Sequence, residues 1–199
     1  TISIAKMRKA MTRFENNRAY FAMLRDVIRD VAAHTNAEDS RYLRPGRGKN
    51  TLIAVIASDK GLAGGFNHNV LKLAYERISA AQHATVACVG MVAGEFFRIH
   101  GIPVAMDFAF GSSDPIVEDA REITDWIVGL YDRGAVDEAY LVYTRMESSA
   151  NMYPETIKLL PLPADEFDAE EELYTELEYE PSAEEVFDAL IPQYLTGTV

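Results

Sequence analysis

Residues 52–67 read LIAVIASDKGLAGGFN. The first seven, residues 52–58, form a continuous apolar run of the kind that is buried in a parallel sheet. A glycine-rich turn follows it, and residues 67–81 then repeat apolar side chains at the three- and four-residue spacing of a helix. The stretch therefore predicts a strand, a tight turn and a helix, which is the first half of a βαβ unit.

The same alternation continues along the chain. We predict further strands at 85–89, 103–110 and 139–144, a fifth strand at 153–160, and a helix at 91–100. Asp114 and Pro115 supply a cap and a first-turn proline for another helix, which stops near Gly134. Strict alternation of this kind predicts an α/β fold with a Rossmann-like, three-layer, mostly parallel sheet.

The first 35 residues form a helical pattern of a different kind. Apolar residues recur at heptad-like steps: Ile4, Met7, Met11, Phe14, Phe21, Leu24, Ile28 and Val31. From Ile4 to Val31 such a helix runs about 40 Å, which is more than a small domain can cover. We expect its C-terminal half to pack on the following domain. The rest, interrupted at Arg18, predicts a coiled coil whose partner helix this chain does not supply.

The acidic tail of the chain is predicted to hold a strand and a helix. Residues 173–179 alternate as a strand, and Ser182 with Glu185 forms a capping box that opens a helix through Leu190, with Pro192 in or just beyond its last turn. We therefore predict four segments: a stalk helix at 1–37, a linker at 38–50, the Rossmann-like domain at 51–164, and an acidic strand and helix at 165–199.

Composition limits the class of protein. The 199 residues are 48% hydrophobic, enough for a buried core, and the single cysteine, Cys88, allows no internal disulfide. No apolar run approaches the ~18 residues that cross a bilayer, so we expect any membrane link to be indirect. The chain opens at Thr1 without an initiator Met, and we expect its start to be trimmed.

Charge is distributed unevenly along the chain. The net charge is −12, yet residues 1–60 hold 12 basic and 6 acidic residues, whereas residues 61–199 hold 7 basic and 25 acidic ones. Such an acidic half repels nucleic acid and anionic lipid. It indicates either a solvated acidic surface or a docking face for basic partners.

The glycine-rich turn does not match a known phosphate-binding motif. Gly61, Gly64 and Gly65 lack the G-x-G-x-x-G spacing of a dinucleotide site, and Lys60 precedes the glycines instead of following them as in a P-loop. Asp59 could be the nucleophile of a phosphatase-like site, but such a site has a second carboxylate two residues later, and Gly61 stands there. The pattern favours a structural turn, and we predict no catalytic, cofactor-binding or metal-binding residues.

The turn does resemble a family signature. Residues 58–67 resemble the S-D-R-G-L-C-G-G-F-N motif of the gamma subunit of F-type ATP synthases, with matches at Ser58, Asp59, Gly61, Gly64, Gly65 and Asn67. Residues 6–10, 143–145, 154–162, 179–182 and 188–195 are similar to further stretches of that family, in the same order. The resemblance covers nearly the whole chain.

The resemblance implies a non-catalytic rotor. In this family the N-terminal helix pairs with a long C-terminal helix in an antiparallel coiled coil, and by this comparison the chain lacks the start of the first helix and all of the last. Proton flow turns a membrane ring, the ring turns gamma, and gamma changes the catalytic sites of the alpha-beta hexamer in sequence. The resemblance places Lys6, Arg8 and Lys9 on the stalk helix, and Tyr179 and Glu180 near the foot.

The implied partners are the alpha and beta subunits, the epsilon subunit and the c-ring, with no cofactor and no nucleic acid. The implied location is peripheral, on the cytoplasmic face of a bacterial cell membrane, with membrane contact only through the ring. Two alternatives stay open. One is a Rossmann-like nucleotide- or phosphate-binding enzyme that uses the turn from Gly61 to Gly65, and the other is a free-standing interaction domain derived from gamma that no longer rotates.

Overall fold

The computed structural model describes residues 2–33, 40–44, 48–61, 64–111, 115–148, 151–163 and 179–199. Contacts divide the chain into two compact units. One unit is Pro45–Leu162, and the other joins Thr1–Arg44 with Pro163–Val199. The first and last segments of the chain thus belong to one unit, and the four-segment division stays a prediction.

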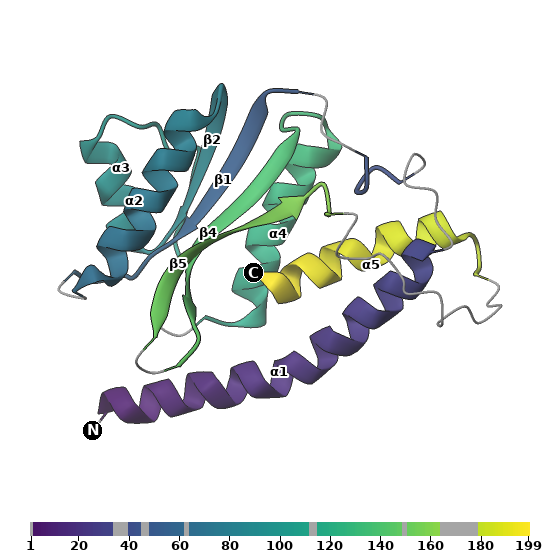
Figure 1. Ribbon diagram of the computed structural model, residues 1–199, viewed down its shortest axis with the longest axis horizontal. Helices are drawn as coiled ribbons and strands as arrows, with labels where there is room; N and C mark the ends of the chain where they lie inside the picture. Colours follow the sequence, from purple (N-terminus) through teal and green to yellow (C-terminus); the bar gives the residue numbers. More distant parts are fainter. Residues whose placement is uncertain are drawn as a thin grey trace. The chain divides into compact units, whose positions relative to one another are not determined.

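A five-stranded sheet forms the centre of the Pro45–Leu162 unit (Figure 1). Its strands are β1 (Asn50–Ile56), β2 (His83–Val89), β3 (Met106–Phe108), β4 (Glu138–Met146) and β5 (Met152–Leu160), in the order β3-β2-β1-β4-β5. The pairs β1–β2, β2–β3 and β1–β4 are parallel, and β4–β5 is antiparallel. The predicted mostly parallel sheet is confirmed.

Helices cover both faces of this sheet (Figure 1). Helices α2 (Gly65–Ala80) and α3 (Met91–Ile99) lie on one face, where Ile53 and Val55 of β1 share a buried cluster with Val70 and Phe97. Helix α4 (Val117–Asp132) lies on the other face and buries Ile123, Ile127 and Val128. Because successive side chains of a strand point to opposite faces, β1 serves both layers, and the predicted three-layer fold is confirmed.

Two strands differ from the expected pattern. Strand β3 is shorter than residues 103–110 and pairs with β2 only from Met106 to Phe108; Pro103 has no N–H to donate to a ladder. Strand β5 follows β4 after a short connection, and residues 147, 148 and 151 within it are joined by backbone hydrogen bonds. A short hairpin can join only antiparallel strands, since a parallel neighbour needs a crossover of a dozen or more residues.

The C-terminal end of α4 agrees with the prediction, whereas its N-terminal cap is a different residue. The helix begins at Val117, after Pro115, and Ile116 is the cap: its N–H donates to the Asp119 carboxylate at 2.9 Å. The predicted cap residue Asp114 lies outside the described residues. The predicted stop is confirmed, because Gly134 has φ +68° and its N–H donates to the Tyr131 carbonyl at 2.9 Å.

The other unit contains α1 (Ile2–Ala33) and α5 (Ala183–Thr198). The predicted cap of α5 is confirmed, since Ser182 Oγ accepts from the Glu185 N–H at 3.2 Å. The helix does not end near Pro192 as predicted but continues to Thr198, and it buries Ile191, Tyr194 and Leu195. Burial of this apolar stripe outweighs the lost proline hydrogen bond. Most of the predicted strand at 173–179 lies outside the described residues.

Charged and aromatic side chains join β4, β5 and α2. Lys158 Nζ donates to Glu138 Oε1 at 3.0 Å, and the Tyr140 hydroxyl donates to Glu138 Oε2 at 3.1 Å. The Arg77 guanidinium of α2 lies 3.7 Å from the centroid of the Tyr140 ring. Burial raises the pKa of Glu138, but the hydrogen bond and charge of Lys158 outweigh burial, so the pKa is lowered overall. No helix in the described ranges is long and apolar enough to cross a membrane.

We predict that Gly90→Ala destabilises the protein more than Gly101→Ala does. Both glycines have positive φ, +88° and +68°, so each change introduces backbone strain of about 1–3 kcal/mol. A Cβ at position 90 would also overlap the Ala57 carbonyl, whereas a Cβ at 101 meets nothing within 4 Å. Urea unfolding measures the difference, and equal losses would contradict this account of Gly90.

We predict that Lys158→Met lowers stability by about 1 kcal/mol or less at pH 7, because the Glu138 pair is only partly buried. A lowered carboxyl pKa stabilises the fold above the usual glutamate range, and this contribution is lost as pH falls through the lowered pKa. The difference in melting temperature between wild type and variant should therefore shrink from pH 7 to pH 3. Lys72→Met, at an exposed pair 4.0 Å apart, is the control and should show little effect at either pH.

Candidate functional site: the glycine-rich turn and the paired helices

The side chains of Ser58 and Asn67 hydrogen-bond to each other and to the backbone of the glycine-rich turn. Asn67 lies in the first turn of α2 and is 8% exposed. Its Oδ1 accepts from the Ser58 N–H at 3.0 Å, and its Nδ2 donates to Ser58 Oγ at 2.7 Å and to the Lys60 carbonyl at 3.3 Å. Ser58 Oγ also lies 2.7 Å from the Lys60 carbonyl. The polar side chains of Ser58 and Asn67 thus bond to the turn itself.

The glycines of the signature have different physical roles. Gly64 has φ 58° and ψ −135°, a conformation that is essentially restricted to glycine. A Cβ on Gly65 would lie 3.3 Å from Asn69 Nδ2, and a Cβ on Gly61 would meet nothing within 4 Å. Asp59 lies close to the loop after β3, because a Cβ on Gly111 would be 3.0 Å from its carboxylate. The geometry favours the structural interpretation of the turn.

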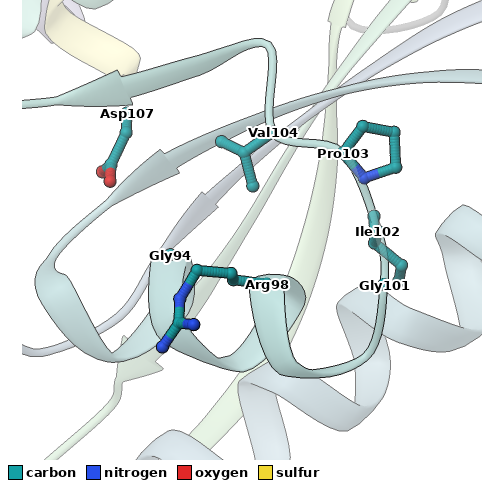
Figure 2. Close-up of a pocket in the computed structure, with 7 residues that line it drawn as sticks. All are labelled: Gly94, Arg98, Gly101, Ile102, Pro103, Val104 and Asp107. Atoms are coloured by element: carbon teal, nitrogen blue, oxygen red, sulfur yellow. The ribbon is translucent and has the colours of Figure 1, made fainter.

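A shallow pocket of about 670 Å³ lies beside α3 and β3 (Figure 2). Its described lining residues are Gly94, Arg98, Gly101, Ile102, Pro103, Val104 and Asp107. Figure 2 shows Arg98 on α3 and Asp107 on β3 as its two charged side chains. None of the described turn residues is among them, so the described part of the turn does not line this pocket.

The single cysteine has no reactive character. Cys88 is buried in β2, and burial, followed by the negative charge of Asp107, raises the pKa of its thiol to about 12. A thiol is nucleophilic only as the thiolate, so Cys88 is protonated and inert at neutral pH.

The two halves of α1 differ in exposure. Leu24, Ile28 and Val31 are 6%, 0% and 1% exposed. From Arg8 to Tyr20, in contrast, every side chain that the structure describes is exposed, Met11 at 38% among them. Arg8 and Lys9 therefore lie on an open helix surface. The side chain of Lys6 lies outside the described part of the chain.

Helix α5 supplies an antiparallel partner for the C-terminal half of α1. The Tyr179 hydroxyl, ahead of α5, donates to Asp30, whereas Gly197, near the end of α5, lies against Phe21. The earlier residue of the C-terminal segment thus meets the later residue of α1, and the later one meets the earlier, so the two segments are antiparallel. The sequence predicts that this half of α1 packs on the following domain, but its partner in the structure is α5, which continues past Pro192 and packs there.

Two carboxylates, Asp30 and Asp188, accept hydrogen bonds at the base of the helix pair. Burial, followed by the hydrogen bond to Asp30, raises the pKa of Tyr179 to about 12. The Asp188 carboxylate accepts from Ser40 Oγ at 3.2 Å and lies 3.5 Å from Arg41 Nε. Glu180, the neighbour of Tyr179, is exposed. Sequence reasoning singled out Tyr179 and Glu180 but missed Asp30 and Asp188, since no local spacing relates them to their distant partners.

Comparison with known proteins gives a consistent result. A family model described as ATP synthase matches residues 1–199. The ATP synthase gamma chain of Ruminiclostridium cellulolyticum is 35% identical over 98% of this chain and 70% of its own length. The sodium ion specific ATP synthase gamma chain of Acetobacterium woodii is 32% identical over 100% of this chain and 71% of its own length.

A solved structure has the same fold. It is a chain of the central stalk and c-ring of the Tetrahymena thermophila mitochondrial ATP synthase, with a TM-score of 0.70 and 16% identity. The match covers 99% of this chain and 85% of that one.

We predict that Asn67→Ala lowers the free energy of unfolding by about 1–3 kcal/mol, because it leaves the partly buried Ser58 N–H without its acceptor. Asn69→Ala, two residues later on the exposed side of α2, is the matched control and should change stability by less than about 0.5 kcal/mol. Urea unfolding of both variants measures this. A phosphate-binding role for the turn predicts instead that wild type, and not the Asn67 variant, is stabilised by millimolar nucleotide.

Proposed function

The chain belongs to the ATP synthase gamma-chain family, and we infer that it is the central-stalk subunit of the rotor, a mechanical and non-catalytic part of the enzyme. Family membership rests on a match over the whole chain and on relatives that the chain covers to about seven tenths of their length. The alternative of a nucleotide- or phosphate-binding enzyme is not favoured.

One observation supports the mechanical function above the rest. Helix α1 is a 32-residue helix whose C-terminal half is packed on α5, whereas its described residues from Arg8 to Tyr20 are exposed. A paired helix resists bending and twisting because each helix buries the apolar stripe of the other. Such an element transmits torque from its packed base toward its open end, and ATP chemistry is left to other subunits.

We further propose where the partners bind. The open half of α1, with Arg8, Lys9 and Lys6, faces the alpha and beta subunits of the catalytic hexamer. The region of Tyr179 and Glu180 faces the epsilon subunit and the c-ring. Because the Tyr179 hydroxyl is bonded to Asp30, Tyr179 shapes this region, and the exposed Glu180 makes the contact.

The proposed location follows from these partners. The protein is held peripherally at the cytoplasmic face of the cell membrane, through the ring alone. The net charge of −12 opposes direct binding to anionic lipid and to nucleic acid.

We predict that the native full-length protein, tagged and purified from its own membranes in mild detergent, brings alpha, beta, epsilon and ring subunits with it. The recovered complex should hydrolyse ATP, and the tagged protein stripped of its partners should not. Subunit identification and ATPase assays on both samples provide the measurement. Recovery of the protein alone would contradict the rotor function and favour the free-standing interaction domain.

A further inference from the structure

Phe21 of α1 lies directly against Gly197 of α5. A Cβ added to Gly197 would fall inside the Phe21 ring, so only glycine fits there with this ring in place. The ring is steadied on its own helix by Tyr20, whose centroid lies 5.2 Å away at an interplanar angle of 73°. Phe21 thus occupies a notch that the missing side chain of Gly197 leaves in α5.

The notch admits Phe21 at one position only. Gly197 is the single glycine of α5, and Thr196 and Thr198 on either side carry side chains. Their hydroxyls donate to the Pro192 and Tyr194 carbonyls, at 2.8 Å and 3.0 Å, so both are held against their own helix. A slide of α5 by one residue, or by one turn to Tyr194, would place a side chain against the ring.

A second contact holds the other end of the pair. The Tyr179 hydroxyl donates to Asp30, and Tyr179 is partly buried there. Between the two contacts, Leu24 and Ile28 of α1 and Ile191 and Leu195 of α5 are buried. An apolar stripe alone tolerates small slides, because hydrophobic burial is not directional. A notch and a hydrogen bond at opposite ends remove that freedom.

We propose that Phe21 and Gly197, together with Asp30 and Tyr179, are positioning residues that fix the axial register of α5 on α1. This inference rests on the proposed rotor function. A fixed register makes the helix pair torsionally stiff at its base, so rotation of one end reaches the other without slip. When the register is lost, ATP hydrolysis continues while ion transport driven by it falls.

The test uses the full-length subunit in its assembled complex, with ATP hydrolysis and ATP-driven ion pumping measured together in vesicles. Gly197→Ala should lower the ions pumped per ATP hydrolysed several-fold. Gly197→Ala with Phe21→Ala, which removes the overlapping ring, should restore most of the ratio. Gly129→Ala in α4 is the matched control: a Cβ there lies 3.6 Å from Arg133 Nη1, an ordinary contact, so the ratio should be unchanged.

Tyr179→Phe keeps the ring and removes only the hydroxyl, so this variant is expected to assemble even if Gly197→Ala does not. It should lower the same ratio by a smaller factor. A wild-type ratio in both Gly197→Ala and Tyr179→Phe would overturn the proposal, as would a ratio in the double variant no better than in Gly197→Ala. If the wild-type subunit itself yields no coupled complex, the rotor function fails and not the register alone.

Discussion

Burial of the apolar stripe of α1 against α5 is the interaction on which the organisation of this chain depends. A helix with Leu24, Ile28 and Val31 on one side cannot leave that side in water, and an isolated long helix gains little from propensity alone. The stripe of α5 covers it. Because α1 lies at the start of the chain and α5 at its end, this packing joins both ends into one unit, and the α/β unit is an insertion between them.

The α/β unit has a sheet architecture that often carries ligand sites, yet its signature turn is used internally. Ser58 and Asn67 bond to each other and to the Lys60 carbonyl, and thereby tie the end of β1 to the start of α2. The described pocket lies elsewhere, beside α3 and β3. A fold therefore does not establish a function, and here the local hydrogen bonds argue for a rigid body that keeps its shape under load.

Rigidity is the property that a shaft requires. The described hydrogen bonds and ion pair at the base of the helix pair connect segments far apart in sequence. They join Tyr179 to Asp30, and Asp188 to Ser40 and Arg41. Each is a modest interaction by itself. Together with the buried stripe they connect α1, the segment after it and α5, so a force on one of them is carried by the other two.

The sequence by itself determined the elements with strong local signals. The apolar run of β1, the helical periods of α1, α2 and α4, the Gly134 stop and the Ser182 cap are all readable, because periodicity and capping depend on residues a few positions apart. The same holds for the signature turn, whose resemblance to the gamma family lies in ten consecutive residues. Tertiary structure alone decided the rest. Helix α5 passes through Pro192 because α1 covers its stripe, Tyr179 bonds to Asp30 across 149 residues, and Gly197 is a notch only because Phe21 lies against it. No local pattern encodes such pairings, since their energies exist only once distant segments are brought into contact.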